Sequence, residues 1–143
     1  TMSAAVEGAM EAIPSIGFSL ADFGSDADFK ASSIIASKII KKVLSIEFPR
    51  NICLNVNIPK LPFEEIKGIK TCKQANAFWN DRFEKRTDQF GNDYYWLTGD
   101  FCESVQDRDT DLYAIRNGYV SVVPTHFDMT AHHLLKQVKN WKL

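Results

Sequence analysis

The first sixty residues carry two helical and two extended patterns of apolar side chains. Apolar residues at spacings of three and four predict helices, and short β-branched or alternating runs predict strands. In chain order, these patterns predict a helix over 1–13, a strand over 15–20, a helix over 28–44 and a strand over 52–58. Helices that alternate with short apolar strands indicate part of a parallel sheet covered by helices.

Individual positions sharpen these predictions. Pro14 ends the first helix. The apolar face of that helix is predicted to hold Met2, Val6, Ala9, Met10 and Ile13. The second helix is predicted to bury Ile35, Ile39 and Val43. On the second strand, Asn55 and Asn57 share one face, where they either line a polar site or bond to neighbouring backbone and water.

Beyond Pro62 the pattern becomes aromatic and strand-forming. It predicts a strand over 66–73 and then a long β-hairpin, with arms over 79–87 and 94–98 and a turn over 88–93. The second arm shows Tyr94 and Trp96 on one face and Tyr95 on the other. Because a lone hairpin is barely stable in water, we expect it to pack on another subunit as well as on its own core. The alternative is packing within the chain alone.

The C-terminal stretch predicts, in order, an acidic loop over 99–109, a helix over 111–116, a strand over 119–123 and a last helix over 131–141. Thr110 is the predicted N-cap of the short helix, and Asn117-Gly118 suits its left-handed end. Pro124 lacks a backbone donor and therefore ends the strand or confines it to an edge. Asp128 and Thr130 are N-cap candidates for the last helix. Its apolar stripe is Leu134, Leu135, Val138 and Trp141.

Composition narrows the class of protein. The chain has 143 residues, 45% hydrophobic and 24% charged, with a net charge of −1, which is ordinary for one soluble globular domain. The charge balance argues against nucleic-acid polymers and anionic membranes as partners. No apolar run approaches the ~20 residues needed to span a bilayer, and no signal-peptide pattern opens the chain. Three widely spaced cysteines, Cys53, Cys72 and Cys102, favour reduced thiols, so we expect a cytoplasmic location.

Six side chains could be imagined as metal ligands, namely Asp107, Asp109, Asp111, His126, His132 and His133. The acidic set lacks the glycine and the glutamate of a calcium loop. The histidines have no cysteine or second carboxylate at a suitable spacing. A contact between Asp128 and His132, four residues apart at a helix start, is the better interpretation. We therefore expect no metal site here, and no spacing indicates a catalytic triad.

Several segments, taken in order, resemble the SurE (survival protein E) family. Thr1–Gly8 resembles the family's Ala-rich helix after a Ser-Gly-Thr turn, and Leu54–Pro59 resembles its Leu-Asn-Val-Asn strand. Gly118–Thr130 resembles its C-terminal signature. The remaining similar segments are 13–20, 66–68, 84–88 and 94–96. Each segment alone is moderately specific, but the ordered set covers nearly the whole chain.

The resemblance implies an α/β fold: the C-terminal part of a three-layer, Rossmann-like α/β/α core with a long protruding β-hairpin and a C-terminal helix. It divides the chain into a core portion, a strand with the hairpin arm, and a helix-strand-helix segment, over 1–62, 63–106 and 107–143. It implies a metal-dependent phosphomonoesterase, a 5′-nucleotidase or acid phosphatase for nucleoside 5′-monophosphates. It also implies assembly as a homodimer or homotetramer.

The same resemblance implies what this chain lacks. The family's metal ligands, an Asp-Asp pair, a Ser and an Asn, would precede Thr1. The chain also opens inside a helix, so we expect a fragment whose N-terminal part is missing. A divalent cation, Mg or Mn, is expected in the intact enzyme. No metal and no catalytic residue are expected on this chain alone.

The site residues that remain form two groups. Thr1, Met2 and Ser3 are expected to bind phosphate, because the start of a helix offers free N–H groups to an anion. The alternative for Thr1 is a plain capping role. Residues expected to serve structure or assembly are Tyr94, Tyr95, Trp96, Asp128 and His132. The rival function is a non-catalytic assembly module, in which the hairpin and the last helix pack on another subunit.

Overall fold

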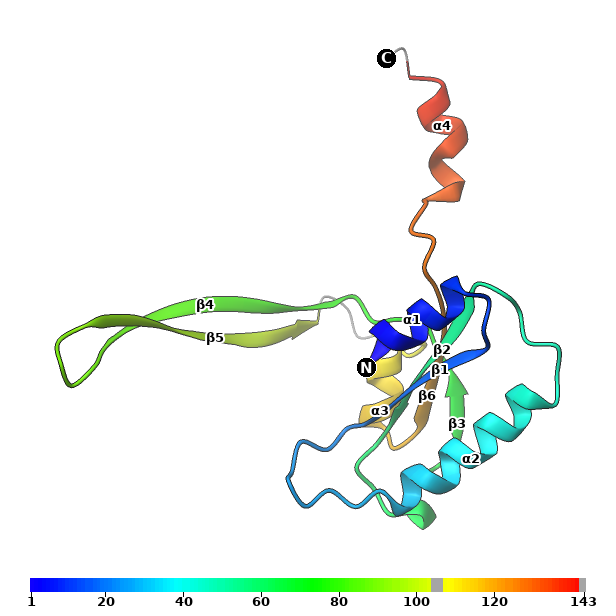
Figure 1. Cartoon of the computed structure of the whole chain (residues 1–143), viewed down its shortest axis with the longest axis horizontal. Helices are drawn as coiled ribbons and strands as arrows, with labels where there is room; N and C mark the ends of the chain where they lie inside the picture. The colour runs from blue at the N-terminus through cyan, green and yellow to red at the C-terminus, as the bar shows by residue number, and fades with distance from the viewer. Residues whose placement is uncertain (104–106, 142–143) are drawn as a thin grey trace.

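A computed structural model, which describes residues 1–103 and 107–141, contains a four-stranded sheet and a separate two-stranded hairpin (Figure 1). The helices are α1 (Met2–Met10), α2 (Lys30–Leu44), α3 (Asp111–Arg116) and α4 (Leu135–Lys139), with 3₁₀ turns η1 (Phe63–Glu65) and η2 (His132–Leu134). The strands are β1 (Ser15–Leu20), β2 (Ile52–Ile58), β3 (Ile69–Thr71), β4 (Ala77–Thr87), β5 (Asp93–Glu103) and β6 (Val120–His126).

The larger sheet has the strand order β1-β2-β6-β3. The β1–β2 and β3–β6 pairs are parallel, whereas β2 and β6 are antiparallel. The predicted parallel arrangement of the first two strands is therefore confirmed. The sheet as a whole is mixed, because β3 and β6 run in the opposite direction to β1 and β2.

Helices cover both faces of this sheet. On one face, α2 packs Ile35, Ile39 and Val43 against the sheet residues Val56, Ile58 and Val120. On the other face, α1 packs Ala5 and Ala9 against Cys53, and α3 packs Ala114 against Cys72 and Val123. The result is the expected three-layer α/β/α arrangement.

The first helix ends earlier than its apolar pattern predicts. Ala12 has a φ of 58°, in the left-handed region, and the N–H of Ile13 donates to the Gly8 carbonyl at 2.9 Å. The N–H of Ala12 donates to the Ala9 carbonyl at 3.1 Å, which completes a Schellman end. The predicted inward positions of Met10 and Ile13 are wrong, since these side chains are 53% and 58% exposed. The backbone turns away before Pro14 can act.

Pro124 does not end its strand. β6 continues to His126, and Pro124 pairs with Leu54 of β2. The Val120 N–H donates to the Gly68 carbonyl, so the backbone of even-numbered β6 residues faces β3. The last residue pair between β3 and β6 is Thr71 with Val122. The missing N–H of Pro124 therefore leaves no hydrogen bond to β3 unmade. Because β6 lies between β2 and β3, both alternatives, an end of the strand at Val123 and an edge strand, are wrong, and Pro124 is tolerated because β3 does not extend beside it.

The strands around the hairpin also differ in length from the prediction. β3 covers Ile69–Thr71 rather than 66–73, because Ile66 is the C-cap of η1 and Gly68 has a φ of 138°. The two hairpin arms are confirmed, and each has 11 residues. The predicted acidic loop over 99–109 is wrong at its start, since Gly99–Glu103 continues β5 opposite β4. Residues 104–106 of that prediction lie outside the described residues.

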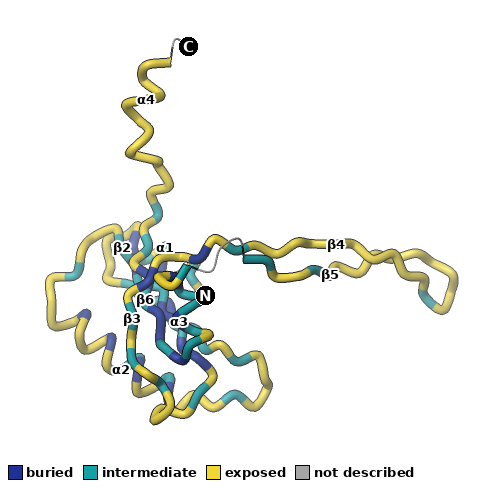
Figure 2. Tube along the Cα trace, turned by 180° about the vertical axis from the view of Figure 1, so that it is seen from behind, coloured by how far each residue is buried: buried dark blue, intermediate teal, exposed yellow. Residues whose placement is uncertain are grey.

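The hairpin and the C-terminal helix both project from the sheet (Figure 1). Figure 2 shows almost all of both projections as exposed. The last helix begins through η2, and the N-cap of α4 is Leu134, so the N-cap roles predicted for Asp128 and Thr130 are wrong. Instead, an Asp128 carboxylate oxygen accepts from the Thr130 N–H in a turn before η2. Among the described residues, no helix has the length and apolarity to cross a membrane.

Candidate functional site

The start of α1 lies against the carboxyl end of β1. The hydroxyl of Ser19, the next-to-last residue of β1, donates to Thr1 Oγ1 at 3.0 Å. Thr1 occupies the N-cap position, yet among the described residues its side chain forms no cap hydrogen bond with the helix. The capping alternative for the Thr1 hydroxyl is therefore wrong. The N–H groups of the first turn have no acceptor within the helix and lie at its positive dipole end, an arrangement that favours an anion.

Gly17 allows this close approach of helix and strand. It is buried in β1, and an added Cβ would lie 2.6 Å from the Met2 sulfur and 3.7 Å from the Ala5 Cβ. Any larger residue would therefore push the first turn of α1 away from β1. Gly17 and Ser19 lie on the same face of β1. Gly17 sets the distance between α1 and β1, and Ser19 supplies the polar contact with Thr1.

A row of polar side chains continues across the same sheet face. Ser19, Asn57, Ser121 and Lys70 stand opposite one another on the four strands in turn. The Asn57 amide nitrogen donates to Asn55 Oδ1 at 3.3 Å and to Ser121 Oγ at 3.5 Å. The two asparagines thus bond to side chains on the polar face. Ser121 is fully buried beneath them.

The far end of this row is closed by aromatic contacts. The Lys70 ammonium lies 4.0 Å from the ring centre of Tyr119 and 6.0 Å from that of Tyr113. Such contacts hold a cation against the ring faces.

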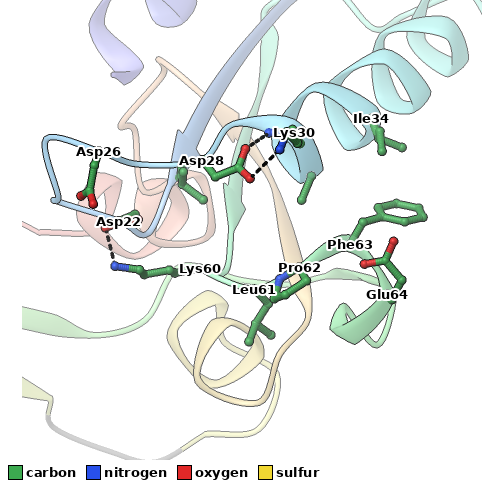
Figure 3. Close-up of a pocket in the computed structure, with 12 residues that line it drawn as sticks. Asp22, Asp26, Asp28, Lys30, Ile34, Lys60, Leu61, Pro62, Phe63 and Glu64 are labelled. Atoms are coloured by element: carbon green, nitrogen blue, oxygen red, sulfur yellow. Dashed lines mark hydrogen bonds and ion pairs between the residues drawn. The ribbon is translucent and has the colours of Figure 1, made fainter.

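A separate pocket of about 600 Å³ lies between the 22–28 loop, the start of α2 and the 60–64 segment (Figure 3). The Asp22 carboxylate, whose side chain is only 8% exposed, pairs with the Lys60 ammonium at 2.9 Å. The Gly24 N–H and the Lys60 ammonium lower the pKa of Asp22. The charged lining comprises Asp22, Asp26, Asp28, Glu64, Lys30 and Lys60. Because carboxylates outnumber ammonium groups there, the pocket does not favour phosphate, and none of the predicted site residues lines it.

The described residues do not fit a metal centre. Among residues 1–103 and 107–141, no group of three or more His, Cys, Asp or Glu side chains could hold an ion. The acidic set has other partners: Asp107 pairs with the Lys73 ammonium, and Asp111 accepts from the Ala75 N–H at 2.9 Å. Lys73 also lowers the pKa of Asp107.

The predicted contact between Asp128 and His132 is confirmed. The His132 Nε2 atom lies 2.6 Å from an Asp128 carboxylate oxygen, and the other oxygen accepts from the Thr130 N–H at 2.8 Å. Hydrogen bonds from Thr130, with a further one from His132, lower the pKa of Asp128 well below its usual range. This contact ties the turn after β6 to the start of η2.

The hairpin presents its aromatic side chains to solvent. Tyr94, Tyr95 and Trp96 are 42%, 65% and 53% exposed, and the Arg86 guanidinium lies 5.0 Å from the ring centre of Trp96. The alternative of packing within the chain alone is contradicted by this exposure. The hairpin base is tied to the core, because Arg116 of α3 forms an ion pair with Glu103.

Ser19 and Ser121 were missed as parts of the polar face. Ser15, Gly17 and Ser19 alternate with apolar residues, and this period of two places small polar residues on the α1 side. That alternation is the one local signal of the contact. The partner, Thr1, is distant in sequence and cannot be identified from local pattern.

Comparison with known proteins relates the chain to one family. A family profile described as Survival protein SurE matches residues 1–81. A protein named 5′-nucleotidase SurE from Christiangramia forsetii is 53% identical over 143 residues, which is 100% of this chain and 55% of that protein. One of the same name from Flavobacterium johnsoniae is 52% identical, with the same coverage. The crystal structure of a SurE protein from Aquifex aeolicus matches with a TM-score of 0.78 and 40% identity, over 97% of this chain and 56% of that one.

Proposed function

This chain belongs to the SurE family, and we propose on that premise that it forms part of a phosphomonoesterase for nucleoside 5′-monophosphates. The support is the match to relatives named 5′-nucleotidase SurE at 53% and 52% identity. The chain spans about half the length of these relatives. We therefore assign the activity to a longer protein that contains this chain, which we term the full-length parent.

The start of α1 is the proposed phosphate site. The observation that carries this proposal concerns the Thr1 hydroxyl. It accepts from the Ser19 hydroxyl at 3.0 Å and forms no cap hydrogen bond with α1. The N–H groups of Met2 and Ser3 and the Thr1 hydroxyl would donate to phosphate oxygens. These residues bind and orient the phosphate of the substrate. Because the N–H groups belong to the backbone, their positions depend on α1 remaining seated against β1.

We assign the remaining chemistry to the rest of the parent. A divalent cation, magnesium or manganese, is proposed to be held by residues outside this chain. In this account the chain alone binds phosphate but does not hydrolyse the ester. A cytoplasmic location completes the proposal and agrees with three free cysteines.

The test is phosphate release from AMP by the purified full-length parent, first with magnesium or manganese and then with excess chelator. Turnover that chelator abolishes is the expected result. Undiminished turnover in chelator would contradict the metal-dependent reaction. The 143-residue chain, assayed in parallel, is expected to release no phosphate.

A second function, assembly of subunits, is supported by the exposed hairpin. Each 11-residue arm is exposed along most of its length. The predicted apolar stripe of the C-terminal segment, which begins in η2 and continues past α4, is also exposed at Leu134, Leu135, Val138 and Trp141. We propose that both projections pack on another copy in a homodimer or homotetramer. Light scattering that finds a well-behaved monomer at high concentration would refute this. Because assembly is measured by mass and hydrolysis by turnover, the two functions are tested separately.

A further inference from the structure

The hydroxyl of Ser19 has a defined role in the contact with Thr1. A hydroxyl group has one proton to donate and two lone pairs that accept. When Ser19 donates to Thr1 Oγ1 across their 3.0 Å contact, a lone pair of Thr1 is occupied. The Thr1 proton is then directed away from β1. A hydroxyl that accepts one hydrogen bond also becomes a stronger donor in the next.

The surrounding residues leave Ser19 available for this contact. Asn57, its register partner on β2, directs its amide nitrogen to Asn55 and Ser121. Gly17, two residues before Ser19, permits the first turn of α1 to lie directly on β1. The distance between Ser19 and Thr1 is therefore set by the packing of helix on strand.

We infer that Ser19 is a positioning residue for phosphate, because its hydroxyl orients the Thr1 hydroxyl as a donor toward an anion at the start of α1. This inference rests on the proposed function, since it requires phosphate to bind there. Ser19 acts through Thr1 and does not itself contact the phosphate. The consequence is that affinity for phosphate depends on a strand residue outside the helix that binds it.

Ser15 provides a matched control on the same strand and face. Its hydroxyl donates to the Ile13 carbonyl at 2.8 Å, and it lies beneath Gly8 at the other end of α1. Ser15→Ala therefore removes a serine hydroxyl and one hydrogen bond from β1 without touching the Thr1 contact. Any effect of Ser19→Ala beyond that of Ser15→Ala comes from the position beside Thr1.

The experiment measures the dissociation constant of inorganic phosphate and the KM and kcat for AMP in the full-length parent. Ser19→Ala is expected to weaken phosphate binding and raise KM by about fivefold to tenfold, the loss of one oriented hydrogen bond. Its kcat is expected to change by less than its KM. Ser19→Thr, which keeps the hydroxyl, is expected to restore phosphate binding. Ser15→Ala is expected to leave both constants within about twofold of the parent.

A double-mutant cycle separates positioning from folding. If Ser19 acts through Thr1, then Ser19→Ala has no further effect on phosphate affinity once Thr1→Ala is present. Additive effects of the two substitutions would overturn the inference. Thermal unfolding of Ser19→Ala and Ser15→Ala gives the matching stability control, and the two are expected to unfold at similar temperatures.

The outcomes also distinguish this inference from the proposed function. Phosphate binding that depends on Ser19, without AMP hydrolysis, would support the inference and contradict the hydrolase proposal. AMP hydrolysis with equal behaviour of Ser19→Ala and Ser15→Ala would retain the hydrolase and overturn the inference. Absence of both phosphate binding and hydrolysis would overturn both.

Discussion

The sheet core and the hairpin of this chain use their side chains in opposite ways. In the core, Val56, Ile58 and Val120 are at most 1% exposed, and helices cover both sheet faces. In the hairpin, Phe83 is 71% and Leu97 58% exposed, although the backbone pairing is complete. A full ladder of backbone hydrogen bonds therefore does not by itself bury an apolar surface.

The difference shows where each region obtains its stability. The core gains from burying apolar area within the chain, at about 25 cal/mol per Å². The apolar side chains of the hairpin stay exposed, so they can contribute the same kind of free energy only when another surface covers them. The core therefore supports the proposed phosphate site, whereas the exposed hairpin is the part that we propose joins subunits.

The largest expected effect is on stability, and it tests the difference between the core and the hairpin. Ile58→Ala removes a fully buried side chain and is expected to lower the free energy of unfolding by about 2–5 kcal/mol. Phe83→Ala, in dilute monomeric protein, is expected to change it by no more than ~0.5 kcal/mol. Urea unfolding followed by circular dichroism measures both. Similar losses in the two variants would mean that the hairpin belongs to the same core.

The next effect concerns the hairpin as a contact surface. Trp96→Ala is expected to weaken self-association at least about 30-fold, because exposed Trp residues often dominate interfaces once they are covered. Sedimentation equilibrium of the full-length parent measures this change. Asn80→Ala, on the opposite arm, keeps the aromatic surface and is the matched control. An unchanged association constant for Trp96→Ala would rule out this arm face as the contact.

A loss of affinity of comparable size is expected at the proposed phosphate site. Thr1→Ala removes a hydroxyl donor to a charged group and is expected to weaken binding of inorganic phosphate about tenfold to a hundredfold. Thr125→Ala, whose hydroxyl bonds to the Val123 carbonyl in β6, is the control. Isothermal titration of phosphate into each variant of the full-length parent gives the comparison. Equal affinities would remove Thr1 from the site.

The smallest expected effect is the response of the C-terminal turn to pH. Hydrogen bonds from Thr130 and His132 lower the pKa of Asp128 in the folded state. The turn is thus stabilised above the ordinary aspartate pKa of about 3.9, and this stabilisation is lost as pH falls through the lowered value. The amide resonance of Thr130, followed by NMR as pH is lowered from about 6, is expected to stay constant through the ordinary aspartate range and to shift only below it. A shift that persists in Asp128→Asn would show that another group titrates.

The sequence predicts the covered parts of this molecule better than its ends. β1, β2 and α3 have the predicted bounds, because their apolar positions face helices or the sheet on a regular period. α1 ends early because Ala12 adopts a left-handed conformation, which alanine seldom does. Pro124 lies within a strand because its neighbour β3 is short. Neither the early end of α1 nor the length of β3 can be predicted from the residue type at Ala12 or Pro124.

The hairpin and the site show the same limit. The arms were predicted, but the extension of β5 to Glu103 was not, since no core imposes an apolar alternation there. Thr1, Met2 and Ser3 were predicted from the helix start and the family resemblance, and their role in phosphate binding stays a proposal. Ser19 was not predicted, because its contact with Thr1 joins residues that are 18 apart in sequence.

The most direct test of the account is where phosphate binds. Inorganic phosphate titrated into the isotopically labelled full-length parent is predicted to shift the amide resonances of Met2, Ser3 and Ser19. Ser19 responds because its hydroxyl holds Thr1 at 3.0 Å. Shifts confined to the pocket residues Lys30 and Lys60, with the start of α1 unchanged, would contradict the account.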